Sequence, residues 1–111
     1  MPAPAHLGEF EQLLLLAILR LGDEAFGADI ARELEQRAGR MVTRGHLYTS
    51  FDRLEEKGLL RWKLAEGTAI RDGLPRRLYA VTPTGLAALR SSREVLKRMW
   101  RGLDDLLKEP S

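Results

Sequence analysis

Residues 43–58, TRGHLYTSFDRLEEKG, contain the pattern on which the fold prediction depends. Their apolar residues recur at the spacing of one buried helical stripe: Leu47, Phe51 and Leu54. Thr43 is suited to cap the helix start, because its hydroxyl can accept from free backbone N–H groups of the first turn. Gly58 is suited to end the helix, because glycine readily adopts the left-handed conformation found at such ends. The stretch therefore predicts an amphipathic helix of about four turns.

The face opposite this stripe is short-chained and polar, and it carries no bulky aliphatic residue. It consists of Gly45, Thr49 and Asp52, flanked by Tyr48 and Arg53. Such a surface lets a partner approach the backbone closely, and about four turns is the span of a helix in a DNA major groove. We interpret this face as a DNA-binding surface.

Composition places the chain among ordinary single-domain proteins. Its 111 residues are 44% hydrophobic and 31% charged, which fits one domain with a modest core. The absence of cysteine excludes disulfides and thiolate sites and favours a reducing cytoplasm. No apolar run reaches the roughly 18 residues of a membrane span. Residues 1–7 are expected to be a flexible N-terminus without a signal peptide.

Positive charge is unevenly distributed along the chain. Residues 1–42 carry a net charge of −3, residues 43–81 carry +3 and residues 82–111 carry +2. The excess of Lys and Arg therefore begins at the helix quoted above, as expected for a surface that faces phosphates.

Two more helices are expected before residue 43. Apolar residues at helical spacing predict one helix over Glu9–Leu21 and a second over about Gly27–Arg37, with Gly39 as its stop. Three short helices joined by tight turns form a unit whose last two members are a helix-turn-helix.

After Gly58 the apolar period becomes that of a strand. Residues 60–64 and residues 76–81 alternate between the two faces of a strand, and glycine-containing turns separate them. A hairpin after a three-helix unit predicts a winged helix over residues 8–81.

The last element is expected to begin with Thr82 as N-cap and Pro83 at the first helical position. Its apolar residues follow a coiled-coil seam: Leu86, Leu89, Leu96, Trp100, Leu103 and Leu107. About 25 helical residues within 82–109 would span about 37 Å, more than the winged helix can cover. We therefore predict a dimerisation helix, with Gly102 as a soft point. The predicted fold class is mainly α with a small β-hairpin, a winged helix-turn-helix with a long C-terminal dimerisation helix.

In this order and spacing, the chain resembles the PadR-like transcriptional regulators, specifically the short members with one C-terminal helix. The resemblance covers about residues 8–100 and is carried by Gly8-Glu9-Phe10-Glu11, Phe26-Gly27, Gly45-His46-Leu47-Tyr48, Asp52 to Leu59 and Pro75 to Gly85. Two positions depart from the family pattern. Thr49 stands where members often carry proline, and Phe51 where they usually carry leucine. Because Thr49 is on the DNA-facing side, a relative's base preference does not transfer to this chain.

The resemblance implies a dimeric repressor of detoxification or transporter genes. It also implies a flat aromatic effector held between tryptophans at the dimer interface, for which Trp62 and Trp100 are the candidates. Core packing is the alternative for Trp62, and packing across the dimer is the alternative for Trp100.

A winged helix places its third helix in the major groove. The candidate DNA contacts on this helix are Thr43, Arg44, Gly45, Tyr48, Thr49 and Arg53. Arg44 is the expected base reader, because guanidinium matches the two acceptors of guanine. Tyr48 either offers its hydroxyl to a phosphate or fills the gap between helix and wing. Gly45 either permits close approach or is a tolerated glycine.

Two further side chains on this helix have competing interpretations. Arg53 either meets phosphate or pairs with an acid of its own helix. His46 is expected to pack or hydrogen-bond on the side that faces the second helix.

The hairpin contributes four more candidate DNA contacts, Lys63, Arg71, Arg76 and Arg77. They are expected to meet phosphates or the minor groove. The alternative is that they are solvated side chains that protect a strand edge.

The residue inventory excludes an enzyme. Two histidines, no cysteine, no cluster at ligand spacing and no phosphate-binding loop leave no metal, cofactor or nucleophile site. We therefore predict a cytoplasmic, sequence-specific regulator with no membrane contact. It would be a homodimeric repressor on a pseudo-palindromic double-stranded operator, released by a small hydrophobic or aromatic effector. The alternative is a winged-helix protein-interaction module that does not bind DNA.

Overall fold

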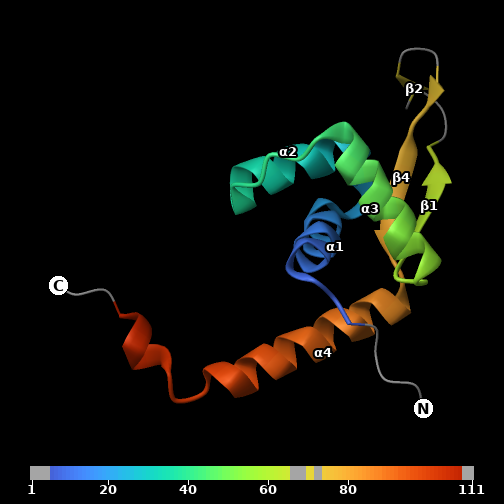
Figure 1. Cartoon of the computed structure of the whole chain (residues 1–111). Helices are drawn as coiled ribbons and strands as arrows, with labels where there is room; N and C mark the ends of the chain where they lie inside the picture. The colour runs from blue at the N-terminus through green and yellow to red at the C-terminus, as the bar shows by residue number, and fades with distance from the viewer. Residues whose placement is uncertain (1–5, 66–69, 72–73, 109–111) are drawn as a thin grey trace.

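The computed structural model describes residues 6–65, 70–71 and 74–108. Three helices pack together beside a hairpin, and a fourth helix leaves this body and extends away from it (Figure 1). In chain order the elements are α1 (Glu9–Leu21), the 3-10 turn η1 (Gly22–Glu24), α2 (Gly27–Ala38), α3 (Arg44–Glu56), β1 (Leu60–Leu64), β2 (Ile70–Arg71), β3 (Leu74–Pro75), β4 (Arg77–Val81), α4 (Pro83–Trp100) and the 3-10 turn η2 (Asp104–Leu107). This order confirms the predicted winged helix.

The first three helices begin and end within one residue of where local chemistry predicted. Gly39 follows α2 with a φ of 67°, and Gly58 follows α3 with a φ of 75°; both values are in the region that favours glycine. Thr43 caps α3, because its hydroxyl accepts from the backbone N–H of His46 at 3.1 Å. α2 extends one residue beyond the predicted Arg37.

β4 forms backbone hydrogen bonds along both of its edges, although the sheet itself has two strands, β1 and β4. On one side β4 pairs antiparallel with β1, with Leu60 opposite Val81. On its other side the backbone N–H of Tyr79 donates to the carbonyl of Ala25 at 2.9 Å, and Phe26 forms a bridge with Leu78. Because β4 is bonded along both edges, the hairpin is attached directly to the start of α2. We call β1–β4 the wing.

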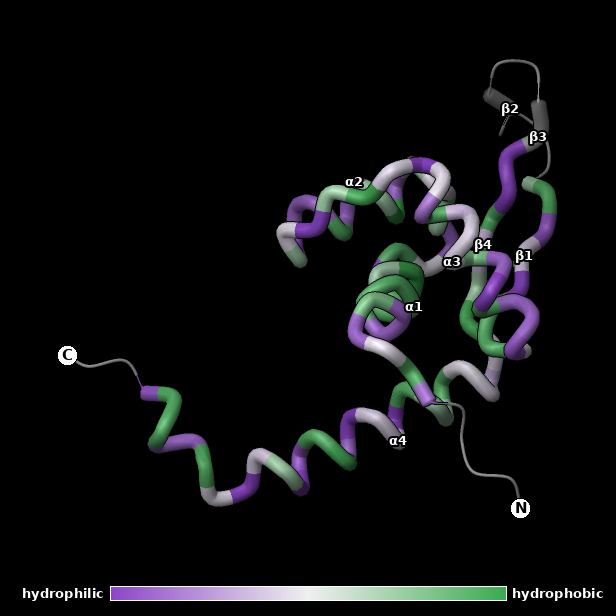
Figure 2. Tube along the Cα trace, in the orientation of Figure 1, coloured by the Kyte–Doolittle hydropathy of each residue, from purple (hydrophilic) through white to green (hydrophobic). Residues whose placement is uncertain are grey.

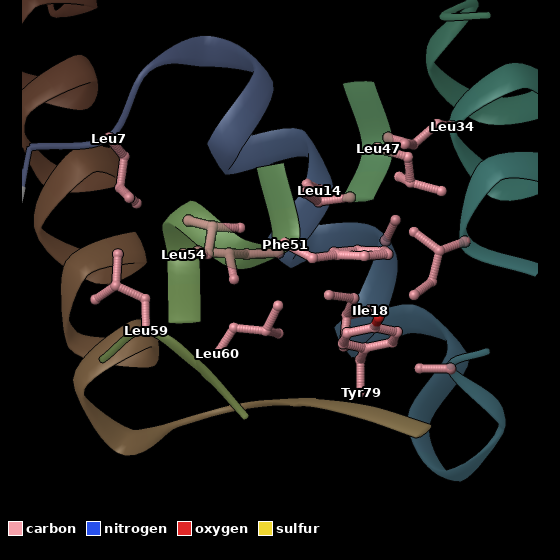
Figure 3. Packing of buried hydrophobic residues seen from close by; sticks show 14 of the residues in the cluster. Leu7, Leu14, Ile18, Leu34, Leu47, Phe51, Leu54, Leu59, Leu60 and Tyr79 are labelled. Carbon is pink, nitrogen blue, oxygen red and sulfur yellow. The ribbon is translucent and has the colours of Figure 1, made fainter. Parts of the chain in front are cut away.

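The core lies between α1, α2, α3 and the base of the wing (Figure 3). The predicted stripe of α3 is fully part of it, since Leu47, Phe51 and Leu54 are each at most 3% exposed. Phe51 stacks on Tyr79 with ring centroids 4.1 Å apart. This contact joins the buried face of α3 to β4 and so determines which face of α3 is left exposed.

α4 is shorter than predicted. It begins as expected, with the Thr82 hydroxyl accepting from the backbone N–H of Gly85 at 3.0 Å, but it ends at Trp100 after 18 residues, or about 27 Å. Gly102 then adopts a φ of 82°, which a right-handed helix cannot continue through. The expected helix of about 25 residues is therefore wrong, and the chain continues as the short turn η2.

Apolar side chains remain uncovered along α4 and η2. Figure 2 shows hydrophobic segments alternating with hydrophilic ones along this projecting arm. Side chains from 41% to 78% exposed are Leu86, Val95, Leu96, Met99, Trp100, Leu103, Leu106 and Leu107. Leu89, predicted to belong to the seam, instead packs partly buried against the core of its own chain. No helix in the described ranges is long and apolar enough to cross a membrane.

Candidate nucleic-acid interface

The outer face of α3 is exposed, as its sequence pattern predicted. Gly45, Thr49, Asp52 and Arg53 all lie at the surface, on the side opposite the buried stripe. Arg44 is exposed at the first helical position, and none of its side-chain nitrogens forms an ion pair among the described residues. Arg44 and Arg53 therefore present two guanidinium groups at the ends of a polar surface whose short side chains let a partner approach the α3 backbone closely.

Tyr48 packs against the start of α2. Its half-buried ring meets the edge of Phe51, with centroids 5.5 Å apart, and a Cβ built at Gly27 would lie 2.8 Å from its hydroxyl. The guanidinium of Arg44 lies 5.8 Å from the Tyr48 ring centroid. The structure thus gives Tyr48 a packing role between α3 and α2. The sequence indicated Gly27 as a helix start and as part of the family resemblance, and in the structure it is the residue that leaves room for this hydroxyl.

His46 lies on a different side of α3 from the one expected. Its ring packs on Phe10 of α1, with centroids 4.7 Å apart, and not towards α2. His46 therefore packs, as predicted, but its neighbour is Phe10 of α1 and not the predicted second helix. The orientation of α3 in the core, which local sequence does not specify, decides which helix this side meets.

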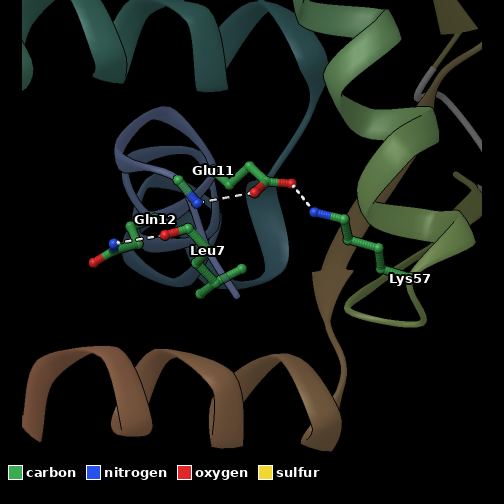
Figure 4. Close-up of polar contacts among 5 residues, drawn as sticks. Leu7, Glu11, Gln12 and Lys57 are labelled. Atoms are coloured by element: carbon green, nitrogen blue, oxygen red, sulfur yellow. Dashed lines mark hydrogen bonds and ion pairs between the residues drawn. The ribbon is translucent and has the colours of Figure 1, made fainter. Parts of the chain in front are cut away.

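One acidic side chain links α1 to the end of α3 (Figure 4). Glu11 accepts from the backbone N–H of Gly8 at 3.0 Å, and Lys57 donates to its other carboxylate oxygen at 2.8 Å. Partial burial raises the pKa of Glu11, but the bonds from Lys57 and Gly8 outweigh it and hold the pKa below its ordinary value. In the sequence Glu11 is notable only as part of the family resemblance, because its partner Lys57 is 46 residues away.

The two consecutive arginines of the wing extend to opposite faces. The guanidinium of Arg77 lies over the Trp62 ring, 4.0 Å from its centroid, and the Trp62 indole N–H donates to Glu55 of α3 at 3.0 Å. Arg77 is thus exposed on the wing face that adjoins α3. Arg76 instead lies over Phe26, at the other edge of β4.

The remaining wing candidates do not join Arg77. Lys63 is opposite Leu78 in the β1–β4 register, so it shares the face away from Trp62, where it is exposed. Arg71 belongs to β2, but its side chain lies outside the described residues. The wing cations predicted as one group are therefore divided between two faces of the hairpin.

The two tryptophans are not brought together within one protomer. Trp62, on the wing, is bonded to Glu55, whereas Trp100 is the last residue of α4, the helix that extends away from the body (Figure 1). Trp100 is 45% exposed. In the described ranges no group of three or more His, Cys, Asp and Glu side chains is placed to hold a metal ion.

Comparison with known proteins agrees with this architecture. A family model described as "Transcriptional regulator PadR-like family" matches residues 15–91. The chain is 40% identical over 79 residues to "Transcriptional regulator Rv3488" of Mycobacterium tuberculosis, and the match covers 71% of this chain and 69% of that protein.

Solved structures show the same fold. The X-ray structure of a PadR-like transcription factor from Bacteroides fragilis has a TM-score of 0.67 and 26% identity, covering 87% of this chain and 88% of its own. F93 from STIV, a winged-helix DNA-binding protein, has a TM-score of 0.69 at 16% identity, covering 88% and 98%, and is similar in fold alone. The regulators that the chain matches in sequence are not enzymes. The chain belongs to the PadR-like family of transcriptional regulators.

Proposed function

We propose that the protein is a homodimeric repressor that binds a pseudo-palindromic DNA site. The observation that carries this proposal is the exposed polar face of α3, held outward by the buried stripe behind it. Inserted in the major groove, α3 would present Arg44 to a guanine edge and Arg53 to phosphate. Arg77, exposed on the adjoining wing face, would meet a flanking phosphate.

The uncovered apolar side chains of α4 and η2 support a homodimer. An apolar surface of this extent is characteristic of an association site. α1 contributes Leu16 and Leu19, which are 45% and 41% exposed. Pairing of α4 and η2 with the same elements of a second protomer would bury these side chains of α1, α4 and η2. It would also fix the separation of the two α3 helices, which must match half-sites about 34 Å apart.

We further propose that a small aromatic effector acts at this interface. Trp100 supports the effector part of the proposal, because its half-exposed ring offers a stacking surface on the arm that would set α3 spacing. An effector that binds one dimer arrangement better than the other shifts the population towards that arrangement and releases DNA. Trp62 is the weaker candidate, because its indole is already bonded to Glu55 and covered by Arg77.

The decisive experiment is titration of the full chain onto its own upstream DNA at several salt concentrations, with random DNA as competitor. We expect a tight complex whose affinity falls steeply with salt, because each neutralised phosphate contributes a slope of about −0.9. An Arg44→Gln variant should lose preference for the operator over random DNA, while Arg77→Gln should weaken both. Binding with no preference over random DNA would refute sequence-specific recognition.

The rival function is a protein-interaction module. The modest net charge of +2 permits it. Absence of salt-dependent DNA binding, with the arm still pairing in sedimentation equilibrium, would favour this rival. The same sedimentation run tests the dimer, since a monomer at micromolar concentration would contradict the pairing of two arms.

The effector proposal is testable by fluorescence. In a Trp62→Phe variant, Trp100 is the only tryptophan, so a planar aromatic dye that binds at the arm should quench its emission and lower operator affinity. Unchanged emission and unchanged affinity would refute this part alone. We propose a cytoplasmic location together with DNA binding, because the relative from Mycobacterium tuberculosis belongs to an organism whose DNA lies in the cytoplasm.

A further inference from the structure

Arg76 occupies the junction between the base and the outer part of the wing. It joins β3, which ends at Pro75, to β4, which begins at Arg77. Its backbone carbonyl accepts from the N–H of Ala65 at 2.8 Å, so the hairpin is closed at this residue. A side chain fixed here controls the direction in which the outer wing leaves the body.

The side chain of Arg76 is held by α2 and the residue that precedes it. Its guanidinium carbon lies 4.0 Å from the centroid of the Phe26 ring, and its Nη2 lies 3.7 Å from a carboxylate oxygen of Asp29. Phe26 caps the start of α2 and Asp29 is in its first turn. Only 28% of the Arg76 side chain is exposed. Planar stacking on Phe26 and an ion pair with Asp29 therefore hold the guanidinium against the start of α2.

Phe26 also contacts the sheet, because it forms an isolated antiparallel bridge with Leu78 on the edge of β4 that β1 does not occupy. Arg76 precedes Leu78 by two residues and extends on the same face of the strand. The guanidinium thus lies diagonally across from Leu78, over the ring of the residue that bridges it. The contact ties the wing to the helix-turn-helix at the point where the two units meet.

We propose that Arg76 is a positioning residue that orients the wing for DNA, and that it is not a phosphate contact. This inference depends on the DNA-binding function proposed above. It assigns the two neighbouring arginines different roles: Arg77 contacts DNA from the α3 side, and Arg76 anchors the wing from the α2 side. Charge alone did not distinguish them in the sequence.

Salt dependence of operator binding separates the two roles. Loss of one phosphate contact in each protomer would reduce the magnitude of the slope by about 1.8 for the dimer. We expect Arg76→Gln to weaken binding about threefold to tenfold with an unchanged slope. Arg76→Lys should restore little, because lysine keeps the charge but lacks the planar group. The matched variant Arg77→Gln should reduce the slope.

A second test uses Asp29. If Asp29 holds Arg76 in place, its own carboxylate does not face a DNA phosphate. Asp29→Asn should weaken operator binding, although removal of an acid normally strengthens DNA affinity. Glu33→Gln, which removes an acid elsewhere on α2, is the charge-matched control. Asp29→Asn also removes the bond that Asp29 accepts from Arg32 at 3.1 Å, and Glu33→Gln removes the equivalent bond from Arg37. In the Asp29→Asn, Arg76→Gln double variant the two losses should be less than additive, because both variants remove the contact between Arg76 and Asp29.

Hydroxyl-radical footprinting supplies a readout that a general loss of stability would not move. With Arg76→Gln, protection from the wing at the flanks of the site should disappear while protection from α3 at the centre persists. The proposal is overturned if Arg76→Gln reduces the slope by about 1.8 and Arg76→Lys restores it, or if Asp29→Asn behaves as Glu33→Gln does. If the wild-type chain binds no DNA, the proposed function fails first.

Discussion

Replacing Gly85 with alanine should destabilise the protein through a clash at the root of α4. A Cβ at this position would lie 2.3 Å from the backbone carbonyl oxygen of Leu59 and 2.7 Å from a methyl carbon of Val81. The first contact cannot be relieved by a side-chain rotation, because the obstructing atom is backbone. That carbonyl also accepts from the N–H of Thr82 at 3.1 Å, a bond that fixes the cap of α4.

The expected magnitude follows from two losses. Overpacking of a close site costs about 1–3 kcal/mol. Weakening the bond between Thr82 and Leu59 costs about 1 kcal/mol more. The free energy of unfolding should therefore fall by about 2–4 kcal/mol, which corresponds to a drop in Tm of about 10–20 °C for a domain of this size.

The assay is urea and thermal denaturation followed by far-ultraviolet circular dichroism. Wild type and variant are compared at equal concentration, because the Tm of a protein that associates depends on its concentration. Gly45→Ala is the matched control, since a Cβ at Gly45 meets nothing within 4 Å. A Gly85→Ala protein within about 0.5 kcal/mol of wild type would show that α4 does not meet the body as closely as the structure has it.

Three more predictions test the site and its support. Gly45→Ala should raise the free energy of unfolding by about 0.5 kcal/mol, because alanine favours the helix. The same variant should weaken operator binding if the α3 backbone approaches DNA at this residue. Unchanged operator affinity would mean that Gly45 has no role in DNA binding and is only tolerated in the helix. Tyr79→Phe should raise stability by about 1 kcal/mol in urea titrations, because in the described part of the chain its buried hydroxyl has no hydrogen-bond partner; destabilisation would reveal a partner. Burial raises the pKa of Tyr79, so wild type should also lose stability faster than this variant above about pH 10. Glu11→Gln should lower the free energy of unfolding by about 1 kcal/mol at pH 7. This difference from wild type should vanish as pH falls through the lowered pKa of Glu11. A difference in unfolding free energy that does not change with pH would contradict the ion pair with Lys57.

Local chemistry was enough to predict the architecture. The caps at Thr43 and Thr82, the glycines that follow α2 and α3, and the apolar periods of helix and strand act over a few residues. The exposed face of α3 follows from the same period, because burying Leu47 forces the opposite side outward. The end of α4 was missed, because an apolar seam continues past Gly102 although the backbone there does not remain helical.

The sequence by itself determined where the first three helices and the paired strands β1 and β4 lie, where α4 begins and which face of α3 is left exposed. Only the tertiary structure decided what each charged side chain does. Arg76 and Arg77 are adjacent and chemically identical, yet one lies over Phe26 and the other over Trp62. Glu11 meets Lys57 from 46 residues away. Such pairings depend on how helices and strands are oriented in the core, and that orientation comes from packing between segments distant in the chain, which no local period or cap encodes.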